Sequence, residues 1–129
     1  MSTDTTASVS THILDTSIGR PAEGVAITLA ARSGSDAAWV TLGGSATDAD
    51  GRCKDLPALP EETTHVRLDF ETETYFAKKQ AEAQQDAPRV RDSGAFFPEV
   101  AITFAVKPGE HYHVPLLLNP FGYSVYRGS

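Results

Sequence analysis

The sequence EHYHVPLLLNPFGYSVYRGS, residues 110–129, predicts two successive strands joined by a turn at residues 119–122. Side chains alternate across a strand, so the first of these strands has two distinct faces. One face is apolar throughout and is expected to be buried: Tyr112, Val114, Leu116 and Leu118. The other face is too apolar for open solvent and therefore predicts a groove or a subunit contact: His111, His113, Pro115 and Leu117.

Short segments with strand character recur along the rest of the chain and predict an all-β fold. Residues 65–71 alternate apolar and polar side chains, so Val66, Leu68 and Phe70 are expected to be buried. Further strands are predicted at residues 9–15, 24–32, 38–42, 52–54, 99–106 and 123–127. The first two of these, joined by a loop, suggest an antiparallel pair, and residues 75–85 are the only helical candidate. The pattern favours an antiparallel β-sandwich of about eight strands in two sheets with one short helix.

Length and composition fit one small globular domain. The chain has 129 residues and a mass of 13.8 kDa, enough for a core but too few for two domains. Residues 1–8 are almost all small and polar. We therefore expect a flexible tail at residues 1–8 and a single domain at residues 9–129.

Charge and cysteine content limit the partners and the compartment. Eleven Lys and Arg residues against 17 Asp and Glu residues give a net charge of -6, which is unsuited to a phosphate backbone or an anionic membrane. No segment has the roughly 20 apolar residues of a membrane span, and the first residues lack the features of a secretory signal. The solitary Cys53 cannot form an internal disulfide. A cytoplasmic protein that binds neither nucleic acid nor membrane is expected.

Of the two histidines in residues 110–129, His113 is the stronger candidate for chemistry. It lies deeper in the strand, where surroundings can tune an imidazole pKa near neutrality, whereas His111 is more typical of a solvated strand start. Alternate positions could aim both imidazoles at a metal ion. Because Cys53 is the only other soft ligand and no compact cluster exists, no metal site is predicted.

Three residues elsewhere could join His113. His12 shares a strand face with Leu14, a position more typical of a packed histidine than of a catalyst. Arg52 leaves a tight turn and could be merely solvated, or could supply a guanidinium fork for a planar anionic or carbonyl-bearing ligand. Tyr126 alternates with Ser124 and would approach the histidines if the last two strands pair. No nucleophile elbow, P-loop or dinucleotide motif is present.

Several motifs resemble those of one known family. They are Ser10-Thr11-His12-Ile13-Leu14-Asp15, Gly19-Arg20-Pro21-Ala22, Thr47-Asp48-Ala49-Asp50-Gly51-Arg52, Tyr75-Phe76, Phe96-Phe97-Pro98-Glu99, His111-Tyr112-His113-Val114-Pro115-Leu116-Leu117-Leu118 and the closing Tyr126-Arg127-Gly128-Ser129. From Val9 onward the chain is similar to the transthyretin-like 5-hydroxyisourate hydrolases of urate and purine breakdown. The closing motif is the most specific, since it separates these hydrolases from thyroid-hormone carriers on the same fold. Two departures are an unusually long segment from Ala77 to Ala95 and Asn119 where serine is common.

The resemblance implies a transthyretin-like β-sandwich assembled as a homotetramer, a dimer of dimers whose interface encloses a channel. It also implies metal-independent, cofactor-free hydrolysis of 5-hydroxyisourate to 2-oxo-4-hydroxy-4-carboxy-5-ureidoimidazoline. The arginine would hold the substrate and its oxyanion, the histidines would transfer protons, and the tyrosine would position substrate or water. The implied catalytic residues are His12, Arg52, His113 and Tyr126, and the implied substrate contacts are Ser124, Leu14, Pro115 and Ser129.

Two other function classes leave different marks on such a sequence. A carrier of flat aromatic ligands in the same channel would resemble the hormone carriers, which have lysine at the position of His12 and glutamate at that of Arg52. An immunoglobulin-like adhesion or scaffolding domain would leave the histidines and Arg52 scattered and solvated. The residues present therefore favour the hydrolase.

Overall fold

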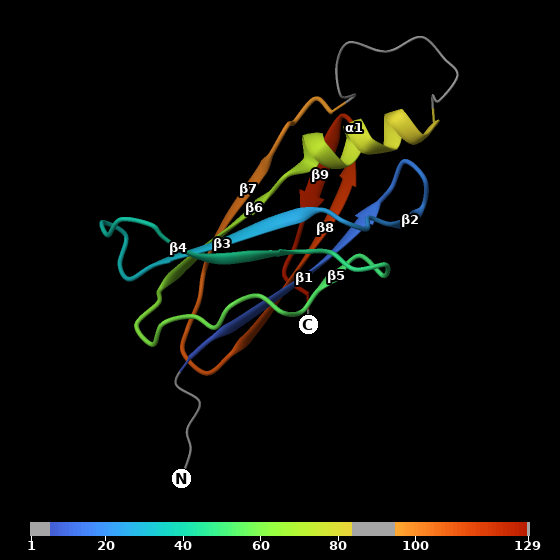
Figure 1. Cartoon of the computed structure of the whole chain (residues 1–129). Helices are drawn as coiled ribbons and strands as arrows, with labels where there is room; N and C mark the ends of the chain where they lie inside the picture. Colours follow the sequence, from blue (N-terminus) through green and yellow to red (C-terminus); the bar gives the residue numbers. More distant parts are fainter. Residues whose placement is uncertain (1–5, 84–94, 129) are drawn as a thin grey trace.

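The structure is a computed structural model that describes residues 6–83 and 95–128 (Figure 1). Its elements are β1 (Ser8–Asp15), β2 (Arg20–Pro21), β3 (Ala26–Arg32), β4 (Val40–Ala46), β5 (Arg52–Cys53), β6 (His65–Phe70), α1 (Thr72–Ala83), β7 (Val100–Ala105), β8 (His111–Asn119) and β9 (Gly122–Val125). Residues 1–5 of the expected tail, most of the long segment 77–95 and Ser129 lie outside the described residues.

Two sheets form a sandwich, which confirms the predicted all-β fold with one helix. One sheet has the order β2-β1-β8-β9 with β5 beside β1, and the other has the order β4-β3-β6-β7. Helix α1 lies at one end of the sandwich (Figure 1). The described residues form nine strands where about eight were predicted, because the two-residue β2 pairs with the end of β1.

Two strands far apart in the sequence, β1 and β8, pair in the middle of the first sheet. β1 and β8 pair in parallel, from Ser8 opposite His111 to Asp15 opposite Leu118, whereas the other strand pairs among the described residues are antiparallel. The predicted pairing of the strand at 9–15 with the strand at 24–32 is wrong, since β1 and β3 lie in different sheets. Both strands have an apolar face, and residues 16–25 carry the chain across so that these faces pack against each other.

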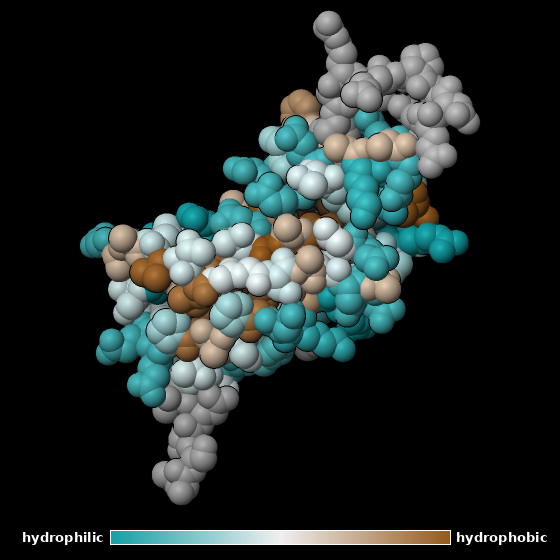
Figure 2. Space-filling view, viewed as in Figure 1, coloured by the Kyte–Doolittle hydropathy of each residue, from teal (hydrophilic) through white to brown (hydrophobic). Residues whose placement is uncertain are grey.

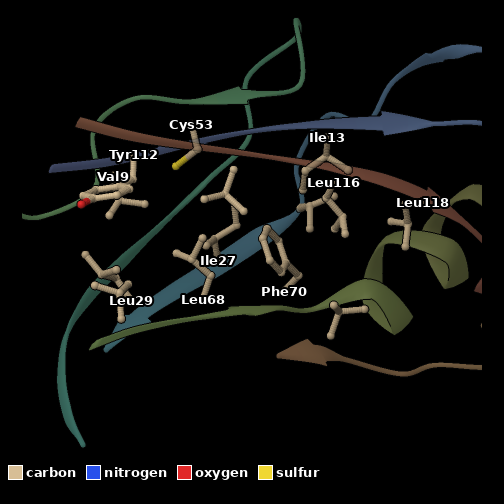
Figure 3. Packing of buried hydrophobic residues seen from close by; sticks show 14 of the residues in the cluster. Val9, Ile13, Ile27, Leu29, Cys53, Leu68, Phe70, Tyr112, Leu116 and Leu118 are labelled. Atoms are coloured by element: carbon tan, nitrogen blue, oxygen red, sulfur yellow. The ribbon is translucent and has the colours of Figure 1, made fainter. Parts of the chain in front are cut away.

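The core lies between the two sheets (Figure 3). Ile13 and Leu116 from the first sheet lie across from Ile27, Leu68 and Phe70 from the second, and each of the five is at most 1% exposed. The two strand faces predicted to be buried, on β6 and β8, are buried throughout. The opposite face of the first sheet therefore points away from the core and is free for function.

Strand β4 differs from the strand predicted at 38–42. Trp39 precedes it, and its ring contacts the guanidinium groups of Arg32 and Arg67 at 4.4 and 5.1 Å. The strand continues instead through Gly43 and Gly44, which resemble a turn in sequence. Pairing with β3 holds both glycines in the sheet, with a register irregularity opposite them.

The described residues include the last part of the segment expected to be a tail. Ala7 is 4% exposed and belongs to the core cluster, and Ser8 is the first residue of β1. The backbone N–H of Ser8 donates to the carbonyl of Glu110 at 3.1 Å. Contact with the residues before β8 thus orders the chain upstream of position 9.

A buried hydrogen bond connects α1 to the end of β1. The hydroxyl of Tyr75 donates to the Asp15 carboxylate at 2.7 Å, and both side chains are buried. Burial and the hydrogen bond to Asp15 raise the pKa of Tyr75, so the phenol remains protonated and continues to donate. The bond therefore fixes the strand end three residues after His12.

Tyr75→Phe is expected to lower the free energy of unfolding by about 1.5–3 kcal/mol, because a buried carboxylate loses a donor while the ring is kept. Chemical denaturation measures the difference. Tyr123→Phe is the matched control. The Tyr123 side chain is 40% exposed, so loss of its hydroxyl should change the free energy of unfolding by less than about 0.5 kcal/mol. Equal unfolding midpoints for Tyr75→Phe and the parent would contradict the role of this bond.

The surface seen in Figure 2 carries small hydrophobic patches among hydrophilic residues. Large apolar side chains that are exposed include Ile18, Val40, Phe96, Phe97, Phe121, Tyr123 and Tyr126. Some of them contact one another, since the Phe97 ring lies 4.9 Å from Phe96 and 5.4 Å from Tyr123.

Among the described residues, α1 is neither long enough nor apolar enough to cross a membrane.

Candidate active site

The outward face of the sheet that contains β1 and β8 is here called the site face. Its side chains are Ser8, Ser10, His12 and Leu14 from β1, Arg52 from β5, His111, His113, Pro115 and Leu117 from β8, and Ser124 and Tyr126 from β9 and the residue after it. Every predicted site residue that the structure describes belongs to this face. Ser129 lies outside the described residues.

A tight turn presents Arg52 on the site face. Gly51 has a φ of 75°, which suits glycine, and a Cβ there would collide with the carbonyl oxygen of Ile13. Asp48 Oδ1 accepts hydrogen bonds from the backbone N–H groups of Asp50 and Arg52 at 2.9 and 3.0 Å. The bond from Arg52 is the main cause that lowers the pKa of Asp48, so the carboxylate stays ionised and holds the turn.

Four strand segments bring three of the four predicted catalytic residues, Arg52, His12 and Tyr126, into one row. Arg52 lies directly opposite His12, and His12 lies opposite Pro115. The backbone N–H of Tyr126 donates to the carbonyl of Pro115 at 3.4 Å, which extends the row beyond β9. Directly opposed residues have Cβ atoms about 5 Å apart, so one small planar ligand can contact neighbouring members of this row.

His113 lies in the next row and packs against the end of the chain. Its carbonyl accepts a hydrogen bond from the backbone N–H of Gly128 at 2.7 Å. A Cβ at position 128 would lie 2.9 Å from the imidazole Cδ2 of His113. Glycine at this position therefore lets the closing segment lie against the imidazole without displacing it.

The surroundings of His113 favour its neutral form. Burial is the main cause that lowers the pKa of this histidine, and the charges of His12, Arg52 and His111 lower it further. The Ser10 hydroxyl lies 2.9 Å from Nδ1 of His113. A neutral imidazole whose Nδ1 is hydrogen-bonded in this way has Nε2 available to exchange a proton with a ligand.

The imidazole of His113 is expected to titrate below pH 6.5 and to be neutral at pH 7. Arg52→Gln should raise this pKa, because it removes a positive charge that opposes protonation. The charged and titratable groups around the imidazole are His12 on β1, Arg52 and Lys54 at β5, and His111 on β8. NMR titration measures both values. A midpoint at or above 6.5, or an unchanged midpoint in Arg52→Gln, would contradict this account.

The third row of the site face is mainly apolar. Leu14 lies opposite Leu117, and Leu117 lies opposite Ser124. Leu14 and Leu117 are half-buried and Pro115 is buried, while Ser124 is exposed. The face therefore combines charged and titratable groups with an apolar floor.

The lining of a shallow cavity of about 200 Å³ on this face includes Ser10 and Lys54, which were not among the predicted site residues. Its lining is Ser10, Thr11, Arg52, Lys54, His111 and His113. Ser10 lies two positions before His12 and Lys54 lies two positions after Arg52. Strand alternation places Ser10 on the same face as His12 and Lys54 on the same face as Arg52, so the sequence pattern could have identified both residues.

Among residues 6–83 and 95–128, no three His, Cys, Asp or Glu side chains gather closely enough to hold a metal ion. His111 and His113, which were considered as a metal-binding pair, instead share a hydrogen-bond partner. The Ser10 hydroxyl lies 2.9 Å from a ring nitrogen of each. This arrangement is a hydrogen-bond network.

A sequence profile of the HIUase/Transthyretin family matches residues 9–128. The chain belongs to this family. Among its relatives is the 5-hydroxyisourate hydrolase of Salmonella dublin, which is 41% identical over 123 residues, or 94% of this chain and 80% of the relative. The resemblance seen in the motifs is thereby confirmed.

Solved structures of the HIUase/Transthyretin family include two different activities. Klebsiella pneumoniae 5-hydroxyisourate hydrolase aligns with a TM-score of 0.71 and 35% identity over 94% of this chain and 98% of that chain. Sea bream transthyretin in complex with thyroxine aligns with a TM-score of 0.71 and 25% identity over 93% of each chain. Because one fold supports both proteins, the residues on the site face must distinguish them.

Proposed function

We propose that the chain is a 5-hydroxyisourate hydrolase of urate breakdown, which opens the substrate ring with water and yields 2-oxo-4-hydroxy-4-carboxy-5-ureidoimidazoline. The observation that carries the proposal is the placing of Arg52, His12 and His113 on adjacent rows of one open face. Relatives named for this activity, at 41% and 35% identity, support it.

Opening a cyclic amide requires a proton acceptor for water, a donor for the developing oxyanion and a donor for the leaving nitrogen. Neutral His113 takes a proton from the attacking water. The Arg52 guanidinium donates to the carbonyl oxygen as negative charge develops there. His12, directly opposite Arg52, gives a proton to the ring nitrogen as the C–N bond breaks. Tyr126 orients the substrate from the other end of the row.

The proposal includes assembly as a homotetramer. The cavity on the site face has about 200 Å³, less than the 300–1,000 Å³ of typical small-molecule pockets. Two such faces that meet across a two-fold axis would enclose a channel with a site on each side. The apolar side chains Leu14, Pro115 and Leu117 would lie at this contact.

The proposal also places the protein in the cytoplasm. Cys53 is a buried free thiol whose pKa is raised, mainly by burial, so it is held in the unreactive thiol form. A free thiol of this kind is typical of a reducing compartment.

The decisive experiment follows freshly generated 5-hydroxyisourate by ultraviolet absorbance with and without purified protein. The decay should accelerate in proportion to protein concentration. Heat-denatured protein at the same concentration is the control. A decay rate equal to the spontaneous one would exclude the hydrolase, and tight binding of a flat aromatic ligand without acceleration would assign the chain to the carriers.

A further inference from the structure

A continuous chain of hydrogen bonds leads from His113 to the exposed start of β1. Nδ1 of His113 lies 2.9 Å from the Ser10 hydroxyl, and this hydroxyl lies 2.9 Å from Nε2 of His111. Nδ1 of His111 in turn lies 2.6 Å from the hydroxyl of Ser8. Ser8 and His111 are exposed, whereas Ser10 is 8% exposed. The chain thus connects an inner imidazole with solvent.

The parallel register of β1 and β8 produces this arrangement. Ser8 lies opposite His111 and Ser10 lies opposite His113, so two serines and two histidines alternate along the same face. The Ser10 hydroxyl therefore lies between the two rings. Its one hydrogen can point to either histidine, and its oxygen can accept from the other.

We propose that Ser10 and His111 form a proton relay that returns the proton taken up by His113 to solvent. The inference rests on the proposed function and adds two positioning residues to it. Both act through His113, and neither is assigned a contact with the substrate.

The relay moves one proton without leaving a charge on the site face. At the start, Nδ1–H of His113 donates to Ser10, the Ser10 hydroxyl donates to Nε2 of His111, and Nδ1–H of His111 donates to Ser8. When Nε2 of His113 takes a proton from water, the Nδ1 proton passes to Ser10 and the Ser10 proton passes to His111. His111 then releases its Nδ1 proton to solvent at Ser8. Both imidazoles end neutral, with every hydrogen bond of the chain reversed. The starting tautomers return after the product leaves, when Nε2–H of His113 gives its proton to water and His111 takes one from solvent at Nδ1. The Nε2 proton of His111 then passes to Ser10, and the hydroxyl proton of Ser10 passes back to Nδ1 of His113.

Electrostatics gives His113 a reason to use such a relay. Its imidazole is half-buried and lies near Arg52, Lys54, His12 and His111, so a lasting positive charge is unfavourable there. The lowered pKa of His113 has the same origin. A route that removes the proton at once avoids this charge.

The test measures steady-state hydrolysis by Ser10→Ala and His111→Gln at low buffer concentration. The glutamine keeps a polar side chain but cannot carry a proton through a ring. In both variants kcat should fall about tenfold with KM unchanged, which is part of the 10²- to 10⁴-fold that acid–base catalysis contributes. Added imidazole buffer should restore kcat, because it accepts the proton directly. Ser10→Thr, which keeps the hydroxyl, should retain most of the parent rate.

Matched controls are Ser33→Ala and His65→Gln, since both residues are associated with the other sheet, away from the site face. Parent-like kcat in Ser10→Ala and His111→Gln, or a loss that imidazole does not restore, would overturn the relay and leave the hydrolase proposal standing. A parent protein that does not accelerate the decay would overturn both. Because His111 is exposed, His111→Gln remains informative even if Ser10→Ala fails to fold.

Discussion

Arg52→Ala is expected to lower kcat for 5-hydroxyisourate hydrolysis by about 10²–10³-fold, because it removes the donor to the developing oxyanion. The Asp48–Gly51 turn holds the backbone of Arg52, and Arg52 lies opposite His12 in the strand register. Its loss should affect kcat more than KM, since the charge on the carbonyl oxygen is largest in the transition state. Steady-state kinetics by ultraviolet absorbance gives both constants.

Two further variants test whether the effect depends on the planar guanidinium of Arg52 and on its position. Arg52→Lys keeps the charge but not the planar fork and should give an intermediate rate. Arg20→Ala removes an exposed arginine from β2 of the same sheet and should leave the rate unchanged. Full activity in Arg52→Ala would show that the assigned oxyanion donor is wrong, even if the protein is a hydrolase.

Leu117→Glu is expected to dissociate the proposed tetramer and to lower hydrolysis by about 10²-fold or more. Leu117 lies between Leu14 and Ser124 on the site face. In the proposed channel each glutamate would be buried near a copy of itself, which costs several kcal/mol for each unpaired charge. Loss of the second face would also leave the substrate poorly oriented, and small misplacements alone can reduce rates about 10²-fold.

Analytical ultracentrifugation and the hydrolysis assay on the same samples test this prediction, with circular dichroism as the check on folding. The matched control is Thr41→Glu, which adds the same charge to an exposed position on the other sheet. If Leu117→Glu remains a tetramer with the parent rate, the site face is not the contact between dimers.

The elements best predicted from the sequence are those whose pattern is local. The alternation in β6 and β8 correctly assigned their buried faces, and the same argument placed His113 on an outward face. The turn before Arg52 could also be predicted from the sequence, because Asp and Gly in this order favour a tight turn. The grouping of His12 and Arg52 with His113 came from the family resemblance, since each residue alone looked unremarkable.

What the sequence pattern missed depends on pairing between distant segments. Nothing local indicates that β1 lies parallel to β8 and not beside β3. The role inferred for Ser10 has the same basis, since its position between two histidines follows from that register. The predicted strand stops at residue 42, before Gly43 and Gly44, because it is pairing with β3 that holds these glycines in β4.

The parallel pairing of β1 with β8 also determines when activity can appear during folding. Ser10 and His113 are 103 residues apart in the chain, so their contact requires closure of almost the whole polypeptide. Long-range pairings of this kind form slowly because the entropy of loop closure opposes them. A partly synthesised chain that lacks β8 has His12 and Arg52 but not His113. Recovery of hydrolysis after refolding would therefore measure the joining of the chain's two ends, whereas spectroscopic signals from β3, β4 and β6 would report earlier, more local events.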